Sequence, residues 1–150
     1  MRRIRLLVTV VAASLVAACA GPLQAAELAK PAASVRSDRS YYVTMRDGVR
    51  IAVSVYFPPG PRQVQRFSSV LMQTRYGRAG IGQWPRTARW LSDGYAVFAV
   101  DTRGSTASFG LRLTELSPDE IQDMDELARN VPNQPWSDGR VIAAGQSYAA

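Results

Sequence analysis

The sequence has no histidine, one cysteine and one lysine among its 150 residues. Because histidine is missing, the chain contains no Ser-His-Asp catalytic triad and no imidazole ligand for a metal ion. The single cysteine, Cys19, has no partner for a disulfide within the chain. We therefore expect no metal site and no cofactor in these residues.

The composition is that of an ordinary globular protein, and the length suits one domain at most. The net charge of +6 would suit a nucleic-acid partner if it were concentrated on one surface. Three basic residues lie within the first five positions, and the others are scattered among acidic residues. Since nucleic-acid affinity depends on concentrated phosphate neutralisation, we expect no nucleic-acid partner. The sequence does not indicate an oligomeric state.

The N-terminus is built like a bacterial secretory signal. Three arginines within the first five residues precede an uncharged run over residues 6–18. This run is shorter than the roughly 20 apolar residues of a comfortable membrane span. We therefore predict a signal peptide over residues 1–18 and export across the inner membrane.

The signal ends in Val-Ala-Ala-Cys at residues 16–19, which resembles the lipobox at which signal peptidase II cuts before an acylated cysteine. We predict lipidation of Cys19, followed by a flexible tether over residues 19–40. Ala20 stands where an Asp would indicate inner-membrane retention, so a lipoprotein of the outer membrane, facing the periplasm, is favoured. The alternative is a soluble periplasmic or secreted protein, cut near residues 23–25.

From Tyr41 onward, short apolar runs alternate with turn residues, which predicts a domain over residues 41–150. Asp47-Gly48 separates two strand-like runs and is a strong hairpin signal. Later runs are apolar throughout, as in strands of a parallel sheet covered on both faces. These runs predict an α/β fold, with an antiparallel hairpin leading into a mostly parallel sheet flanked by helices. The predicted strands are 41–45, 51–57, 69–74, 95–100 and 141–144, with a helix over 84–91.

The clearest helix begins at Ser117, with Pro118 at its first position and Glu120 completing a capping box. Its buried face is expected to hold Ile121, Met124, Leu127, Ala128 and Val131. A group of carboxylates on this helix, Asp119, Asp123, Asp125 and Glu126, could form a metal or acid-base cluster. The favoured interpretation is that Asp119 and Glu120 complement the helix N-terminus, while the others lie on a solvated face.

Gly145-Gln146-Ser147-Tyr148-Ala149 follows the last predicted strand directly. A serine between small residues after a buried strand is the setting of a nucleophile elbow, a sharp turn that presents the hydroxyl above the sheet. The turn also points the next backbone N–H toward a developing oxyanion. Five residues of this kind often occur by chance, so a structural turn at the strand end is the alternative.

Six segments at matching intervals resemble the S15 peptidase and cocaine esterase group of α/β-hydrolases, the CocE/NonD or Xaa-Pro dipeptidyl-peptidase-like family. The Asp-x-Arg-Gly and Trp-Ser-Asp-Gly segments are its most specific features. Together the resemblance covers residues 43–150 in the order of the family. The segments are 45–50, 75–77, 94–97, 101–104 with 108–110, 134–141, and 145–148.

The resemblance implies the N-terminal portion of an α/β-hydrolase fold, truncated at the nucleophile elbow. It implies that Ser147 is the nucleophile and that the backbone N–H of Tyr148 and the hydroxyl of Tyr76 form the oxyanion hole. Tyr76 could otherwise be a loop aromatic. Asp101 and Arg103 are expected to form a structural ion pair or to shape their loop.

One position departs from the family pattern. Ala150 stands where glycine is common, so the helix after the serine would pack less closely against the strand.

In α/β-hydrolases the acid and the histidine follow the serine along the chain. We therefore expect these residues to be the N-terminal fragment of an exported serine hydrolase, inactive or nearly so by itself. The complete form would cleave ester or amide substrates, Xaa-Pro dipeptidyl substrates among them, through an acyl-enzyme on Ser147. The alternative function is a non-catalytic envelope lipoprotein or pseudoenzyme remnant that acts as a binding module. A phosphate loop at residues 77–82 is disfavoured, because its glycine spacing is not G-x-G-x-x-G.

Overall fold

The structure is a computed structural model, and it describes residues 36–60 and 66–147. The predicted signal peptide, Cys19 and most of the predicted tether lie outside these residues, as do Tyr148 and Ala150. The elements of the described residues are, in chain order, β1 (Arg39–Thr44), β2 (Arg50–Tyr56), β3 (Phe67–Thr74), α1 (Arg78–Ile81), α2 (Pro85–Ser92), β4 (Ala96–Asp101), α3 (Pro118–Asn130), the 3-10 helix η1 (Val131–Asn133) and β5 (Ser137–Ala143).

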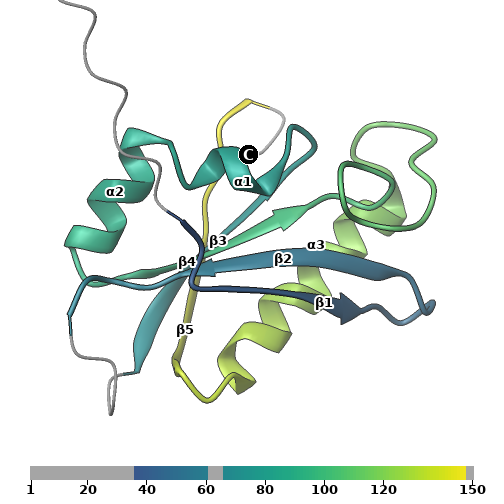
Figure 1. Cartoon of the computed structure of the whole chain (residues 1–150). Coiled ribbons are helices and arrows are strands. Elements are labelled where there is room, and N and C mark those ends of the chain that lie inside the picture. The colour runs from purple at the N-terminus through teal and green to yellow at the C-terminus, as the bar shows by residue number, and fades with distance from the viewer. Residues whose placement is uncertain (1–35, 61–65, 148–150) are drawn as a thin grey trace, which may run out of the picture. The chain divides into compact units, whose positions relative to one another are not determined.

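The described strands form one mixed sheet in the order β1-β2-β4-β3-β5 (Figure 1). β1 and β2 form the predicted antiparallel hairpin, and β2 is also antiparallel to β4. At the hairpin turn, Gly48 adopts a φ of 81° and the Asp47 carboxylate accepts a hydrogen bond from the Val49 backbone N–H. β3 is parallel to both β4 and β5. The parallel arrangement predicted from the apolar runs is thereby confirmed.

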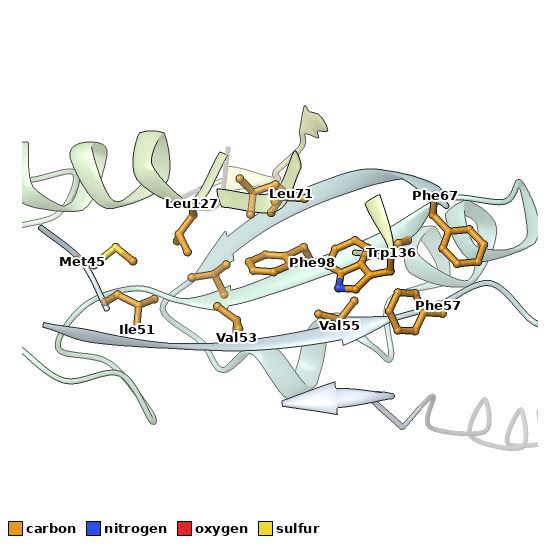
Figure 2. Packing of buried hydrophobic residues seen from close by; sticks show 13 residues of the cluster. Met45, Ile51, Val53, Val55, Phe57, Phe67, Leu71, Phe98, Leu127 and Trp136 are labelled. Carbon is orange, nitrogen blue, oxygen red and sulfur yellow. The ribbon is translucent and has the colours of Figure 1, made fainter. Parts of the chain in front are cut away.

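Side chains of the central strands pack against helices on both faces of the sheet. α3 lies on one face, and α1 and α2 lie on the other (Figure 1). On the α3 face, Trp136 packs between Phe57 and Phe98, with ring centroids 5.3 Å and 6.3 Å apart respectively (Figure 2). Residues of β3 and β4 alternate between the two clusters, because successive side chains of a strand point to opposite faces. This two-sided burial explains why these strands are apolar throughout.

The structure corrects the predicted face of α3. The Ser117 hydroxyl accepts a hydrogen bond from the Glu120 backbone N–H, so the predicted N-cap is confirmed. Ile121, however, is 59% exposed, while Asp123 is only 2% exposed. The buried face at the start of the helix is polar because two arginines, described below, lie against it. The prediction of a buried Ile121 and a solvated Asp123 was therefore wrong.

The structure also corrects the start of the last strand. The predicted strand begins at residue 141, but β5 already begins at Ser137. Gly139 has a φ of 92°, and the pairing with β3 is irregular between Phe67 and Ser69. Glycine permits this backbone conformation, which allows a kinked strand where the sequence suggested a turn. α1 and η1 were not predicted either.

We expect the stability of the fold to decrease at low pH through Asp138. Burial alone would raise the pKa of Asp138, but hydrogen bonds from the Arg140 side chain and the Ser68 hydroxyl lower it to about 2. A carboxyl group whose pKa is lower in the folded than in the unfolded state stabilises the fold at pH values above its unfolded-state pKa. This stabilisation is lost as the pH falls toward the folded-state pKa. In urea unfolding, Asp138→Asn should have a lower free energy of unfolding than the wild type at about pH 6. The difference between the two free energies should become smaller below about pH 3. If the difference in free energy of unfolding does not change with pH, Asp138 is not a source of the pH dependence.

Candidate active site

The carboxyl ends of three neighbouring strands meet at one edge of the sheet. β3 ends at Thr74, β4 at Asp101 and β5 at Ala143. The Thr102 backbone N–H donates to the Thr74 carbonyl at 2.9 Å, which holds the ends of β3 and β4 together. The loops that follow these strands carry the predicted site residues Tyr76 and Ser147. In open parallel sheets, this edge is where ligands bind.

Ser147 occupies a strained turn just after β5. Its φ of 57° lies in the left-handed region, which residues other than glycine rarely adopt. The strand leading to it is held in the sheet up to the turn, since the Ala144 backbone N–H donates to the Leu71 carbonyl at 3.0 Å. The Ser147 residue is exposed. A sharp, strained turn that exposes a serine at the strand end is the geometry expected of a nucleophile elbow.

A surface hollow lies beside this turn. It is lined by Gln146, the neighbour of Ser147, and by Trp84, Pro85 and Arg86 at the start of α2. The turn therefore borders a concave surface.

Tyr76 extends from the loop after β3. Its side chain is 68% exposed. Its backbone N–H donates to the Thr74 hydroxyl at 3.1 Å, and its own hydroxyl accepts a hydrogen bond from Arg75 at 2.9 Å. The Arg75 guanidinium also lies 4.9 Å from the centre of the Tyr76 ring and forms an ion pair with Glu115. The position of the ring is thus set by its backbone and by one neighbouring side chain.

Asp101 is fully buried at the end of β4. One carboxylate oxygen accepts the Arg78 backbone N–H at 2.6 Å, and the other accepts the Arg78 guanidinium at 2.5 Å. The second oxygen also accepts the Ala107 backbone N–H at 3.3 Å. Asp101 thus has the expected structural role, but its ion-pair partner is Arg78, while Arg103 pairs with other carboxylates. The Arg78 backbone N–H is therefore already bound by a carboxylate and is not open to a phosphate.

Arg103 joins the loop after β4 to α3 and to the hairpin. Its guanidinium makes two hydrogen bonds of 2.6 Å to Asp123 and one of 2.8 Å to Asp47. The hydrogen bonding of the guanidinium to the Asp123 carboxylate is the largest cause of a raised pKa of Arg103, so the guanidinium stays charged. Arg46 reaches the same Asp123 at 3.1 Å. The structural role predicted for Arg103 is confirmed, and the α3 carboxylates serve as ion-pair partners.

The structure places two predicted site residues, Ser147 and Tyr76, in the loops after neighbouring strands. Tyr148 and Cys19 lie outside the described residues. No group of three or more His, Cys, Asp or Glu side chains is arranged to hold a metal ion within residues 36–60 and 66–147. In that same part of the chain, no helix is long and apolar enough to cross a membrane.

Sequence reasoning missed three residues that support this edge. They are Arg75, Arg78 and Ser54, whose hydroxyl accepts a hydrogen bond from the Arg78 guanidinium at 3.0 Å. An arginine directly before Tyr76 could have suggested a partner for its hydroxyl. The contacts of Arg78 depend on strand order, since Asp101 and Ser54 come from strands that lie side by side only in the folded sheet.

Residues 47–150 match the family described as X-Pro dipeptidyl-peptidase (S15 family). The chain belongs to the S15 peptidase family. Among its relatives, a protein of Mycobacterium bovis named as a serine esterase is 43% identical over 127 residues, which cover 73% of this chain and 20% of the relative. The cocaine esterase of a Rhodococcus species is 37% identical over 112 residues, which cover 71% of this chain and 18% of that enzyme. This S15 chain therefore spans about a fifth of the length of the curated relatives it matches.

A solved CocE/NonD family hydrolase from Staphylococcus aureus has the same fold as this S15 chain. The two superpose with a TM-score of 0.64 and 26% identity, over 74% of this chain and 23% of the other. Other solved α/β-hydrolases share the fold at lower identity. The predicted N-terminal α/β-hydrolase portion and the predicted family are both confirmed.

Proposed function

We propose that this chain carries the nucleophile of a serine hydrolase, with Ser147 attacking the carbonyl carbon of an ester or amide. The observation that carries the proposal is the left-handed φ of Ser147 directly after β5. Backbone strain of this kind persists only where the surrounding structure enforces it, and it concentrates at functional sites. Relatives named as esterases support an ester substrate, and the family description supports the Xaa-Pro amide as the second candidate.

In the proposed reaction, the Ser147 Oγ forms a bond to the substrate carbonyl carbon and its proton passes to an imidazole base. The carbonyl oxygen becomes negative and accepts hydrogen bonds from the Tyr148 backbone N–H and the Tyr76 hydroxyl. When the intermediate collapses, the bond to the leaving alcohol or amine breaks, and that group takes the proton from the imidazolium. Water then hydrolyses the acyl-Ser147 ester through the same steps.

The base in this reaction has to come from outside these residues, because the sequence contains no histidine. We propose that the 150 residues act as part of a longer polypeptide, which we call the complete protein. Its length would match relatives of which this chain spans about a fifth.

A fluorophosphonate probe on the complete protein tests the proposal. The probe should label one serine, and mass spectrometry should place the label on the peptide that contains Ser147. Ser147→Ala should not be labelled, whereas Ser92→Ala, which alters an exposed serine of α2, should be labelled as the wild type is. A folded complete protein that stays unlabelled, or is labelled elsewhere, would overturn the proposal and favour the non-catalytic lipoprotein.

Tyr76→Phe should lower kcat by about 10²–10³-fold with little change in KM, since one oxyanion donor is removed. The measurement is hydrolysis of 4-nitrophenyl acetate and of glycyl-prolyl 4-nitroanilide by the complete protein. Tyr42→Phe is the matched control, because Tyr42 is also an exposed tyrosine but lies on the edge strand β1. If kcat is the same in Tyr76→Phe and in the wild type, Tyr76 is only a loop aromatic.

A further inference from the structure

We propose that Asp101 is a positioning residue for Tyr76, which it acts on through Arg78. This inference rests on the proposed function, because it concerns how the hydroxyl of Tyr76 is aligned with the reacting carbonyl oxygen. Asp101 itself is buried and bound to Arg78 and Ala107, so it is not assigned contact with substrate.

Both oxygens of the Asp101 carboxylate bind the same residue. One fixes the Arg78 backbone and the other fixes the Arg78 side chain, at 2.6 Å and 2.5 Å. The other side of the Arg78 guanidinium is bound at 3.0 Å to Ser54, whose hydroxyl lies 2.8 Å from that of Ser40. Hydrogen bonds with a charged partner are among the strongest in proteins. Arg78 is therefore held from β4 and from β2 at once.

We call Arg78 with its two anchors, Asp101 and Ser54, the clamp. One glycine separates Tyr76 from Arg78. Gly77 has a φ of 100°, a conformation that favours glycine, and its Cβ position has no neighbour closer than 3.8 Å. The glycine is therefore required by the backbone turn and not by crowding. On the other side, the Tyr76 backbone is tied to the Thr74 hydroxyl. The short segment that carries Tyr76 is thus fixed at both ends, and the Arg78 end depends on Asp101.

The clamp matters because the Tyr76 side chain has little packing of its own. It is 68% exposed and has Arg75 as the partner of its hydroxyl. A ring with so little packing takes its position from its backbone and from Arg75. An oxyanion donor has to be in place before the charge develops, and a displacement of about 1 Å can cost about a hundredfold in rate. Loosening Arg78 should therefore reduce the contribution of Tyr76 to kcat.

The test is a kinetic double-mutant cycle on the complete protein with 4-nitrophenyl acetate. Asp101→Asn leaves one oxygen where there were two, so either the Arg78 guanidinium or the Arg78 backbone N–H faces an NH₂ group, and the other meets a neutral oxygen. We expect kcat to fall about tenfold to a hundredfold with KM nearly unchanged. In the Tyr76→Phe background the same substitution should change kcat by less than about twofold, because there is no longer a hydroxyl to position.

Asp123→Asn is the matched control, since Asp123 is an equally buried carboxylate clamped to an arginine, but on α3. Its effect on kcat should be the same with and without the Tyr76 hydroxyl. If Asp101→Asn does not fold, Ser54→Ala replaces it in the cycle, because it removes the other anchor of Arg78 and should show the same dependence on Tyr76. Independent effects of Asp101→Asn, or of Ser54→Ala in its place, and Tyr76→Phe would overturn the inference. Full activity of Ser147→Ala would instead overturn the proposed function itself.

Discussion

Ser147→Ala should reduce the turnover of the complete protein by about a million-fold, as the loss of a nucleophile does in serine hydrolases. The residual rate would come from substrate binding and the oxyanion hole, which the substitution leaves in place. KM should change little, because the serine hydroxyl acts in the transition state. The measurement is kcat and KM for 4-nitrophenyl acetate and for glycyl-prolyl 4-nitroanilide. A reduction of less than about tenfold would exclude Ser147 as the nucleophile.

The strained turn gives Ser147 a second signature, which does not depend on activity. Ser147→Gly removes the side chain that disfavours a φ of 57°, so it should stabilise the fold by about 1 kcal/mol while abolishing turnover. A serine at an ordinary strand end would show the opposite, because glycine is the more flexible residue in the unfolded chain. Urea unfolding of Ser147→Gly, Ser147→Ala and the wild type separates the two cases.

The parts of the fold that follow from local pattern could be predicted from the sequence. The buried runs in β3 and β4, the Asp47-Gly48 hairpin and the Ser117 cap each depend on neighbouring residues. The position of Ser147 could be predicted for the same reason, since its turn is defined by the strand before it and the small residues around it. The burial of Trp136 could not be predicted in this way, because it lies in a turn before β5, yet its ring packs in the core between Phe57 and Phe98.

The contacts that shape the site could not be predicted in this way. Asp101 contacts Arg78 only because β3 and β4 are adjacent in the sheet. The residues of neither strand indicate which strand lies beside it. Asp123 was assigned to a solvated face because charged residues of a helix usually point to water. The arginines that bury it come from the hairpin and from the loop after β4, far away in the sequence. A single sequence does not reveal which distant arginine will neutralise a given carboxylate.

Arg103→Met should lower the free energy of unfolding by about 3–5 kcal/mol, because it leaves the buried Asp123 without its main partner. Arg103 is 5% exposed and Asp123 is 2% exposed, and the two are joined by two hydrogen bonds of 2.6 Å. Methionine fills a similar apolar volume, so the loss reports on charge and hydrogen bonding. Urea unfolding of the variant and the wild type measures the difference.

Two further variants separate a buried ion pair from a general need for arginine. Arg129→Met removes an exposed partner of Asp125 on the same helix and should cost less than about 1 kcal/mol. The double variant Arg103→Met with Asp123→Leu removes both buried charges together. It should regain most of the lost stability, since an apolar pair avoids the desolvation that an unpaired carboxylate suffers. If the double variant is as unstable as Arg103→Met, the arginine stabilises the fold through Asp47 and the hairpin, and its pairing with Asp123 is secondary.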